Sequence, residues 1–451
     1  MIAEWEPRWI DVFQLTARVT AEPLEPASNG VRPSARDSHV PSLLAGAAGG
    51  REMAILGWCD APLKERGRPF CCKVEDSQIG VCCMRIAQVS EFYYPHLGGV
   101  TEHVHNLTHE FLSRGHEVII LTSNMRGQGT DPEFVRRVGT SRVLYSNGSF
   151  SRITTGWGLA RRVEAVLRGE RIDLVHVHCA LAPTLGLLVP TVADRLGIPV
   201  VATFHSWFPR SLAFQIFRRP LQRRLDRIEA KIAVSEPAVS AVARYFRAEW
   251  IVIPNGVKVG YFHPNGREST GAWRRSPRLL FLGRLDPRNG LDTLLAAMPR
   301  ILSRHPGTRL IVAGDGPLRR YYEWRARSLG EGVRFVGRVY EERAALYGAA
   351  DLYLCPTRKA SFGITLLEAM ACGTPIIGSD VTGFRELING GQEAVLTPAS
   401  DAAAWADAVL ELIADPPRRD AMGAAGLAKA AQFAWPNVAQ RILEVYRRVL
   451  G

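Results

Sequence analysis

Apolar residues from Met84 onward follow two alternating patterns. Short runs of consecutive apolar residues are typical of strands buried on both faces, and apolar residues at steps of three and four are typical of helices packed on a sheet. The first unit combines a strand at 86–89, a loop at 91–100, a helix at 101–114 and a strand at 118–122. A strand, a helix and a strand within about 40 residues predict a parallel βαβ unit.

The same alternation continues through two halves of the chain. Two doubly wound, Rossmann-like domains that face a central cleft are therefore expected, in an α/β protein whose ligand lies at the strand ends. We assign 84–256 to the first domain, 257–432 to the second and 433–451 to a closing helix. Further strands are expected at 173–178, 200–205, 231–235, 250–257, 278–283, 309–314, 333–337, 352–354 and 375–378.

Residues 1–83 differ from the rest of the chain. They mix Pro, Ser, Gly and Ala without a sustained period, which predicts a low-order extension or a wrongly assigned start. No signal peptide or membrane-spanning segment is expected. Five of the eight cysteines precede Met84, and Cys179, Cys355 and Cys372 stand singly in apolar segments, so a reducing, cytosolic compartment is the simplest interpretation.

The charge balance favours anionic partners. Lys and Arg exceed Asp and Glu by 56 − 44 = 12, yet no nucleic-acid-binding motif accompanies this excess. Much of the basic charge falls around 211–232, where apolar residues recur at steps of three and four. This pattern predicts a basic amphipathic helix, which either rests on an anionic bilayer or packs on the domain with a solvated basic face.

The segment 360–377 carries the strongest candidate chemistry. An apolar strand ends before a polar loop, and Ser361 is the expected N-cap of the helix that follows. Free amides around Gly363 suit a diphosphate, and the carboxylate of Glu368 suits the hydroxyls of a ribose. The alternative is an ordinary βαβ crossover with a surface glutamate.

Other candidates follow predicted strands. Gly98 and Gly99 form a loop that lets backbone amides approach a phosphate, although a tight turn explains them equally well. Arg284 and Arg288 lie in one loop and can hold a diphosphate. His205 ends a strand, where it is expected to point into the cleft. His176 and His178 share a strand face, but without an evident third metal ligand they are interpreted as core or cleft histidines.

Together these segments resemble the retaining glycosyltransferases of family 4, which have the two-domain GT-B fold. The resemblance covers about four-fifths of the chain, from Met84 onward. The region from the histidine strand at 175–178 to 203–206 is most similar to bacterial phosphatidylinositol mannosyltransferases. The matching segments are Gly98-Gly99, Thr203-Phe204-His205, Pro254-Asn255-Gly256-Val257, Gly283-Arg284, Ala313-Gly314-Asp315-Gly316-Pro317, Ser361-Phe362-Gly363 and Glu368-Ala369-Met370-Ala371-Cys372-Gly373.

The resemblance implies roles for individual residues. Gly98 and Gly99 would line the donor phosphates, Arg284 would bind the diphosphate and Glu368 the ribose. His205 would lie near the reacting sugar, and the closing helix would cross back to the first domain. The expected donor is a UDP- or GDP-sugar, with no resident cofactor and no metal. Amides near the helix start would contact the donor sugar and phosphate, at Phe362, Gly363, Ile364 and Thr365.

Two positions depart from the family pattern. The first of its two paired glutamates would fall at Ala360, and its usual lysine beside the diphosphate would fall at Asn289, which leaves Arg288 as a substitute cation. An active, same-face hexosyltransferase acting on a membrane lipid at the cytosolic face remains the favoured hypothesis. The alternatives are a nucleotide-sugar-binding protein with impaired catalysis, a transferase for a soluble or polysaccharide acceptor, and an epimerase. The donor base and sugar, the acceptor and the oligomeric state stay open.

Overall fold

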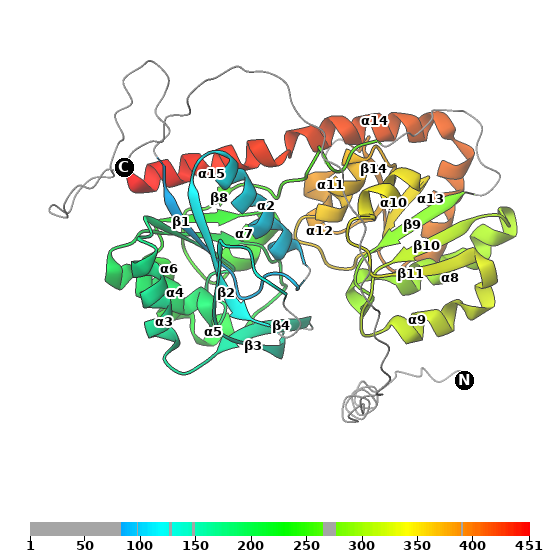
Figure 1. Cartoon of the computed structure of the whole chain (residues 1–451). Helices are drawn as coiled ribbons and strands as arrows, with labels where there is room; N and C mark the ends of the chain where they lie inside the picture. Colours follow the sequence, from blue (N-terminus) through cyan, green and yellow to red (C-terminus); the bar gives the residue numbers. More distant parts are fainter. Residues whose placement is uncertain (1–82, 97, 126–128, 147–148, 265–276, 389–390) are drawn as a thin grey trace, which may run out of the picture. The chain divides into compact units, whose positions relative to one another are not determined.

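The computed structural model describes residues 83–96, 98–125, 129–146, 149–264, 277–388 and 391–451. The predicted low-order extension at 1–83 concerns residues that, except for Cys83, lie outside this part of the chain. The described residues form two α/β domains, each built on one sheet (Figure 1). Within them, every helix is too short or too polar to cross a membrane.

The sheet of the first domain has the strand order β4-β3-β2-β1-β5-β6-β7-β8, and its pairs are parallel except for β3 with β4. The order reverses between β1 and β5, and ligands bind outside the carboxyl ends of strands at such a switch point. The strands are β1 (Arg85–Val89), β2 (Glu117–Asn124), β3 (Val135–Ser146), β4 (Ser149–Thr155), β5 (Leu174–His178), β6 (Val200–Phe204), β7 (Ala230–Ala233) and β8 (Ile251–Val252). The helices are α2 (Gly99–Ser113), α3 (Leu159–Gly169), α4 (Leu185–Leu196), α5 (Leu212–Ile216), α6 (Arg218–Leu225) and α7 (Glu236–Ala243).

The second sheet is wholly parallel, in the order β11-β10-β9-β12-β13-β14, and reverses between β9 and β12. Its strands are β9 (Arg278–Leu282), β10 (Arg309–Ala313), β11 (Val333–Gly337), β12 (Leu352–Cys355), β13 (Ile376–Ser379) and β14 (Ala394–Thr397). Its helical segments are η1 (Pro287–Asn289), α8 (Leu291–Arg304), α9 (Arg319–Ala326), η2 (Arg327–Gly332), α10 (Arg343–Ala349), α11 (Ile364–Ala371), α12 (Thr382–Leu387), α13 (Ala402–Ala414) and α14 (Pro416–Gln432).

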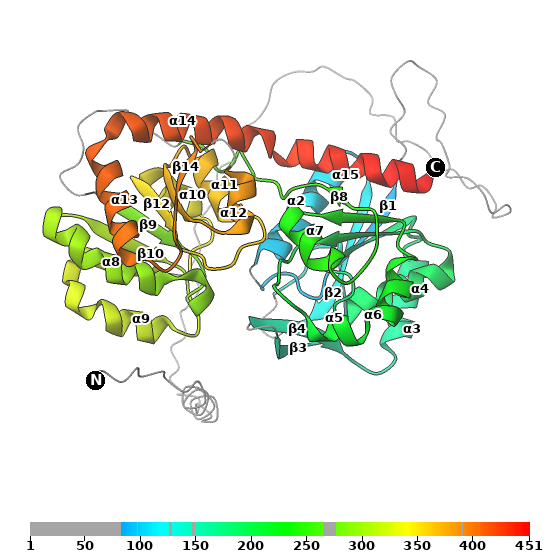
Figure 2. The same ribbon diagram turned by 180° about the vertical axis from the view of Figure 1, so that it is seen from behind.

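The last helix, α15 (Trp435–Leu450), leaves the second domain and packs on the first. Figures 1 and 2 show α14 over the second sheet and α15, in red, beside β1 and α2 of the first. Val438, Ile442 and Leu443 are buried in one apolar cluster with Ile86 and Leu107. The carboxyl-terminal helix is therefore part of the first domain's core.

The two chain crossings between the domains run side by side. The amide of Val257 donates to the carbonyl of Phe433 over 2.8 Å, and the amide of Trp435 donates back to the carbonyl of Val257 over 3.3 Å. The Trp435 ring covers Gly256 so closely that a Cβ added there would lie 2.5 Å from the ring. The two chain segments that connect the domains are therefore hydrogen-bonded and closely packed against each other.

The Gly256→Ala variant is expected to lower the thermal stability of the chain. Because the added methyl must displace the buried Trp435 ring, a cost of about 2 kcal/mol is expected, the usual scale for overpacking a core. Thermal unfolding of the two proteins measures the effect. Gly260→Ala is the control, because a Cβ there meets nothing within 4 Å. Equal melting temperatures for Gly256→Ala and wild type would contradict the close packing.

The predicted single basic helix at 211–232 is wrong. The structure has two short helices, α5 and α6, which meet at Phe217, and the chain then enters β7. A continuous helix would need an amide at position 220, where Pro220 has none, so the break at Phe217 avoids an unsatisfied carbonyl. Ile232 continues the apolar spacing by coincidence, since it is buried in β7 between β6 and β8.

Candidate functional site

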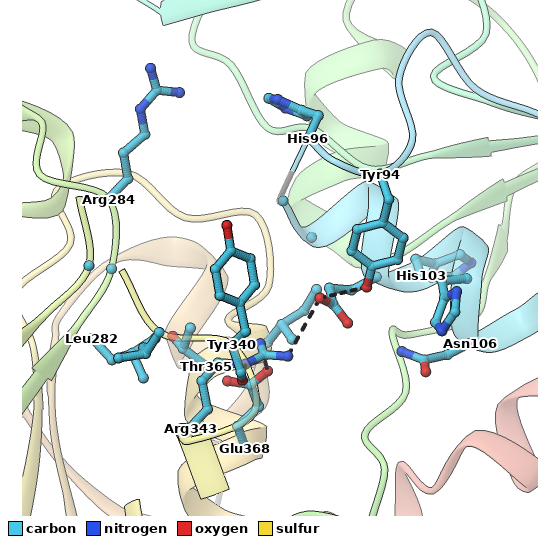
Figure 3. A pocket seen from close by; sticks show the side chains of 18 of the residues that line it. Tyr94, His96, His103, Asn106, Leu282, Arg284, Tyr340, Arg343, Thr365 and Glu368 are labelled. Atoms are coloured by element: carbon cyan, nitrogen blue, oxygen red, sulfur yellow. Dashed lines mark hydrogen bonds and ion pairs between the residues drawn. The ribbon is translucent and has the colours of Figure 1, made fainter. Parts of the chain in front are cut away.

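A cavity of about 1170 Å³ is lined by residues of both domains. Its walls come from the loop after β1 and the start of α2 on one side, and from the loops after β9 and β10 with α10 and α11 on the other (Figure 3). β1 and β9 both border the switch points of their sheets. The cavity therefore lies where the strand topology of both domains places a ligand.

The structure brings together six of the residues that the sequence singled out. Gly98, Gly99, Arg284, Ile364, Thr365 and Glu368 all line this cavity. The remaining candidates, which are His205, Arg288, Asn289, Phe362 and Gly363, are not among its lining residues. One of these five, Asn289, instead bonds the backbone of a lining residue, Arg284.

Glu368 lies on α11 and is almost fully buried, at 3% exposure. Its Oε1 accepts a hydrogen bond from Nη1 of Arg343 over 2.8 Å, and its Oε2 accepts one from the hydroxyl of Tyr347 over 3.0 Å. Burial raises the pKa of this carboxyl to about 7, against the opposing effect of the Arg343 charge. A carboxylate has about four acceptor positions, so two remain for a ligand in the cavity.

The start of α11 differs from the prediction. The N-cap is Gly363, with φ 114°, and the hydroxyl of Ser361 instead accepts a hydrogen bond from the amide of Trp207 over 2.7 Å. The side chain of Phe362 is buried against Phe433. Because the first amides of a helix have no acceptor within it, those of Ile364 and Thr365 are available at the cavity wall.

A glycine at the start of α2 allows the two domains to approach each other. A Cβ added to Gly99, at the first position of α2, would lie 2.9 Å from Cδ1 of Ile364 in the facing domain. Glycine at this position therefore keeps the start of α2 close to the start of α11. Two helix N-termini, each with free amides, then face one cavity.

Arginines of both domains bring positive charge to the same cavity. The side chain of Arg284 is 45% exposed and lies 3.9 Å from its acidic neighbour Asp286. Arg152 lines the opposite wall from β4, and its pKa is lowered by burial and by the charge of Arg284. Burial and these two arginines also lower the pKa of His96 to about 4. This part of the cavity is therefore suited to an anion.

Arg288 and Asn289, in the same loop as Arg284, do not line the cavity. Arg288 is exposed on η1, and its carbonyl accepts from the amide of Arg358. Asn289, at the position of the expected lysine, donates its side-chain amide to the carbonyl of Arg284 over 2.7 Å. Asn289 thus fixes the backbone that carries Arg284.

Ala360 lines a second, smaller cavity of about 240 Å³. Trp207 contributes from the first domain, and Lys359, Asp380 and Arg385 from the second. Arg385 forms an ion pair with Asp380. The missing first glutamate therefore leaves this cavity with an excess of basic side chains.

His205 belongs to a buried histidine cluster behind the main cavity. Its Nε2 lies 3.0 Å from Nδ1 of His178, and its ring contacts that of His103 at 4.7 Å between centroids. Nitrogens of these three rings lie within 4.8 Å of one another, which makes them the group in the described chain that could hold a metal ion. His176 instead bonds Tyr446 and Thr203. The sequence did not single out His103, which comes from α2.

Burial lowers the pKa of all four histidines, His103, His176, His178 and His205. Since the unfolded chain then binds more protons than the folded chain below about pH 6.5, the protein is expected to lose stability as the pH falls from 7 to 5. Each histidine that stays neutral contributes about 2 kcal/mol to this loss.

Melting temperatures at pH 7 and pH 5 test this expectation. The His176→Asn variant should show a smaller fall than wild type, because it no longer contains one of the buried titrating groups. An equal fall in melting temperature in the two proteins would contradict the interpretation that His176 is buried and neutral.

Several lining residues were not singled out in the sequence, and three of the charged or phenolic ones lie on separate elements. Glu102 belongs to the first turn of α2, Arg343 begins α10, and Tyr94 precedes the glycine loop. None belongs to a recognisable motif. The proximity of Glu102 to Arg343, which are 241 positions apart, arises only when the two domains fold.

Comparison with known proteins identifies the family. Residues 97–261 match the family described as Glycosyltransferase Family 4, and residues 276–415 match the one described as Glycosyl transferases group 1. The chain is 34% identical over 376 residues to the phosphatidyl-myo-inositol mannosyltransferase of Propionibacterium freudenreichii subsp. shermanii, covering 80% of this chain and 94% of that protein. It is 33% identical over 375 residues to the same-named protein of Mycobacterium tuberculosis, covering 82% and 98%.

Solved structures agree on the GT-B fold. A sucrose-phosphate synthase from Thermosynechococcus elongatus superposes with a TM-score of 0.63 and 24% identity over 81% of this chain and 98% of that one. Anabaena Alr3699/HepE, in complex with UDP and glucose, gives 0.63 and 20% over 81% and 99%. Together with the sequence relatives, these matches show that the chain belongs to glycosyltransferase family 4 and is a nucleotide-sugar-dependent glycosyltransferase.

Proposed function

We propose that the protein transfers a hexose, with retention of configuration, from a nucleotide diphosphate sugar to a hydroxyl of a membrane lipid. Mannose is the proposed sugar and an inositol phospholipid the proposed acceptor, because two relatives are named phosphatidyl-myo-inositol mannosyltransferases. The observation that carries the donor part is the convergence of Glu368, Arg284 and the start of α11 on one cavity.

Each of these groups matches one part of the donor. The two unused acceptor positions of Glu368 suit the hydroxyl pair of a ribose. Arg284 and the amides of Ile364 and Thr365 suit the diphosphate. Structures of Anabaena Alr3699/HepE are described as complexes with UDP and with UDP-glucose. This likeness supports a nucleotide sugar as donor and leaves uracil and guanine as candidates for the base.

The proposed mechanism needs no protein nucleophile. As the bond between the sugar and the diphosphate breaks, negative charge grows on the leaving phosphate, and Arg284 and the helix-start amides stabilise it. The acceptor oxygen attacks from the same face and gives its proton to that phosphate. No step is assigned to a resident cofactor or a metal. The His103 ring, which packs against the rings of His178 and His205, is proposed to shape the sugar side of the cavity.

An anionic acceptor fits the first domain. Arg152 lines the cavity from β4 without a described acidic partner, and its charge can attract the phosphate of a lipid head group. α5 and α6 present apolar side chains to solvent, with exposed fractions of 70% for Leu212, 64% for Ile216 and 56% for Phe217. Arg219 and Arg223 lie exposed beside them. We propose that this surface rests on the anionic inner face of the cytoplasmic membrane.

Transfer of radiolabelled sugar to extracted lipid tests the proposed function. The full chain is incubated with UDP-glucose or GDP-mannose and vesicles that contain phosphatidylinositol, and the lipid product is separated and analysed. Labelled lipid with retained configuration supports the proposal. Donor binding without product would favour the impaired binding protein suggested by Ala360 and Asn289. An isomerised nucleotide sugar formed without acceptor would favour an epimerase.

Membrane binding is expected to depend on α5 and α6. A variant with Leu212→Ser, Ile216→Ser and Phe217→Ser should co-sediment far less with phosphatidylglycerol vesicles, because about 1.5 kcal/mol or more is lost for each apolar side chain removed from the bilayer. Tyr321→Ser with Trp324→Ser on α9, also exposed, is the matched control. An equal loss in the control, or none in the triple variant, would contradict this docking surface.

A further inference from the structure

Arg343 lies between two carboxylates that belong to different domains. Its Nη1 donates to Glu368 of α11 over 2.8 Å, and its Nη2 lies 3.5 Å from Oε1 of Glu102 on α2 of the facing domain. The same Oε1 accepts a hydrogen bond from the hydroxyl of Tyr94 over 3.0 Å. In Figure 3, dashed lines run from Arg343 and from Tyr94 to this one carboxylate. A continuous polar chain therefore joins the first domain to the ribose-site glutamate.

The surroundings make Arg343 the main source of charge compensation for Glu368. The other titratable groups that face Glu368 are the phenols of Tyr347, Tyr353 and Tyr261 and the carboxylate of Glu102. Among the described groups that act on Glu368, Arg343 is the one that carries a positive charge. Its guanidinium is mostly shielded, with 22% of the side chain exposed and the ring of Phe262 5.5 Å from its centre. A shielded charge is weakly screened by salt.

We propose that Arg343 is a positioning residue that keeps the Glu368 carboxylate ionised and oriented for the donor ribose, and that Glu102 of the facing domain adjusts its effect. This inference rests on the proposed donor site. It adds a residue outside the sequence motifs, and it makes donor binding in the second domain depend on a carboxylate of the first.

The ionisation state of Glu368 decides how well it binds a ribose. A carboxylate accepts from both hydroxyls of the diol, whereas the protonated acid has fewer acceptor positions and no charge. Burial raises the pKa of Glu368 to about 7, and Glu102 raises it while Arg343 lowers it. Donor affinity should therefore be half-maximal near pH 7, approach its full value about one pH unit above that and decline below it.

Substitutions of Arg343 and of Glu102 should shift the midpoint of this profile in opposite directions. In Arg343→Met the buried Glu368 carboxylate no longer has a positive charge beside it, which raises its pKa. The midpoint of the affinity profile should therefore move upward by about one pH unit or more. In Glu102→Gln a nearby negative charge disappears while a hydrogen-bond acceptor for Arg343 stays, so the midpoint should move downward. Arg343→Lys keeps the charge and should lie between Arg343→Met and wild type.

The experiment measures the dissociation constant of the full chain for UDP-glucose and GDP-mannose by calorimetry from pH 5.5 to 9. The phosphates of these diesters stay ionised throughout this range. Burial also lowers the pKa of cavity residues His96 and His103 to about 4, so neither titrates within it. At about pH 6, below both midpoints, Arg343→Met should bind the donor about tenfold more weakly than wild type, as follows from a shift of one pH unit.

The outcomes separate this inference from its alternatives. Midpoints that move up in Arg343→Met and down in Glu102→Gln support it. An affinity loss in Arg343→Met that is equal at every pH, with an unmoved midpoint, would mean that Arg343 only contacts the donor, and would overturn it. If Arg343→Met fails to fold, an unmoved midpoint in Glu102→Gln overturns the link between domains. Absence of donor binding by wild type would overturn the proposed function itself.

Discussion

The Arg284→Ala variant is expected to transfer sugar about 100- to 1,000-fold more slowly than wild type, the scale for losing one group that stabilises transition-state charge. Arg284 lines the cavity with 45% of its side chain exposed and forms a long, 3.9 Å ion pair with Asp286, so most of its donors are available to the donor diphosphate. Negative charge on the diphosphate grows as it leaves the sugar. The loss of Arg284 should therefore lower kcat more than it lowers donor affinity. Steady-state and single-turnover kinetics measure both.

Arg288→Ala is the matched control for this prediction. Arg288 lies in the same loop and has the same charge, but its side chain is exposed on η1 outside the cavity lining. The activity of the Arg288→Ala variant should stay within a few-fold of that of wild type. If Arg288→Ala lost as much activity as Arg284→Ala, Arg288 would be the substitute cation that the sequence suggested, and the loop would have to move when the donor binds.

The Glu368→Ala variant is expected to bind a nucleotide sugar about 100-fold more weakly than wild type. Hydrogen bonds to a charged group contribute about 1.5–3 kcal/mol each, and the loss of two is only partly offset by water. Tyr347 and Arg343 would also lose their common partner. Calorimetric titration measures the change, and a donor at 100 times its dissociation constant should no longer raise the melting temperature of the variant.

A second buried glutamate provides the control for Glu368. Glu393 is 8% exposed in the same domain and does not line the cavity. Glu393→Ala should therefore keep wild-type donor affinity even if it lowers stability. Unchanged affinity in Glu368→Ala would remove the ribose contact from the proposed function.

The arrangement of domains could be predicted because most strands of both sheets are buried on both faces. Strands such as β1, β5, β6 and β10 appear in the sequence as short apolar runs between helical patterns. Strands β3, β4 and β14, which lie at the sheet edges or beside them, were not predicted from the sequence. β3 alternates polar and apolar residues irregularly, so it does not resemble a buried run, whereas β14 is a four-residue run like the predicted β12 and could have been recognised.

The candidate site could be predicted only where its residues form local motifs. Gly98-Gly99, Arg284 and the segment around Glu368 each follow a strand, and the strand topology alone brings them together. Glu102, Arg343 and Arg152 carry no such pattern. Each is an ordinary charged residue in the sequence, and its place in the cavity depends on helix orientation or on β4, which had not been predicted.

The position of α15 has a consequence for how the protein folds during its synthesis on the ribosome. The core of the first domain includes Val438, Ile442 and Tyr446, whereas the strands and helices of the second domain all precede Trp435 in the chain. Synthesis proceeds from the amino terminus, and domains commonly fold in that order. Here the first domain emerges early but keeps an open apolar face until α15 has been made, so the domain that is made first is completed after the second.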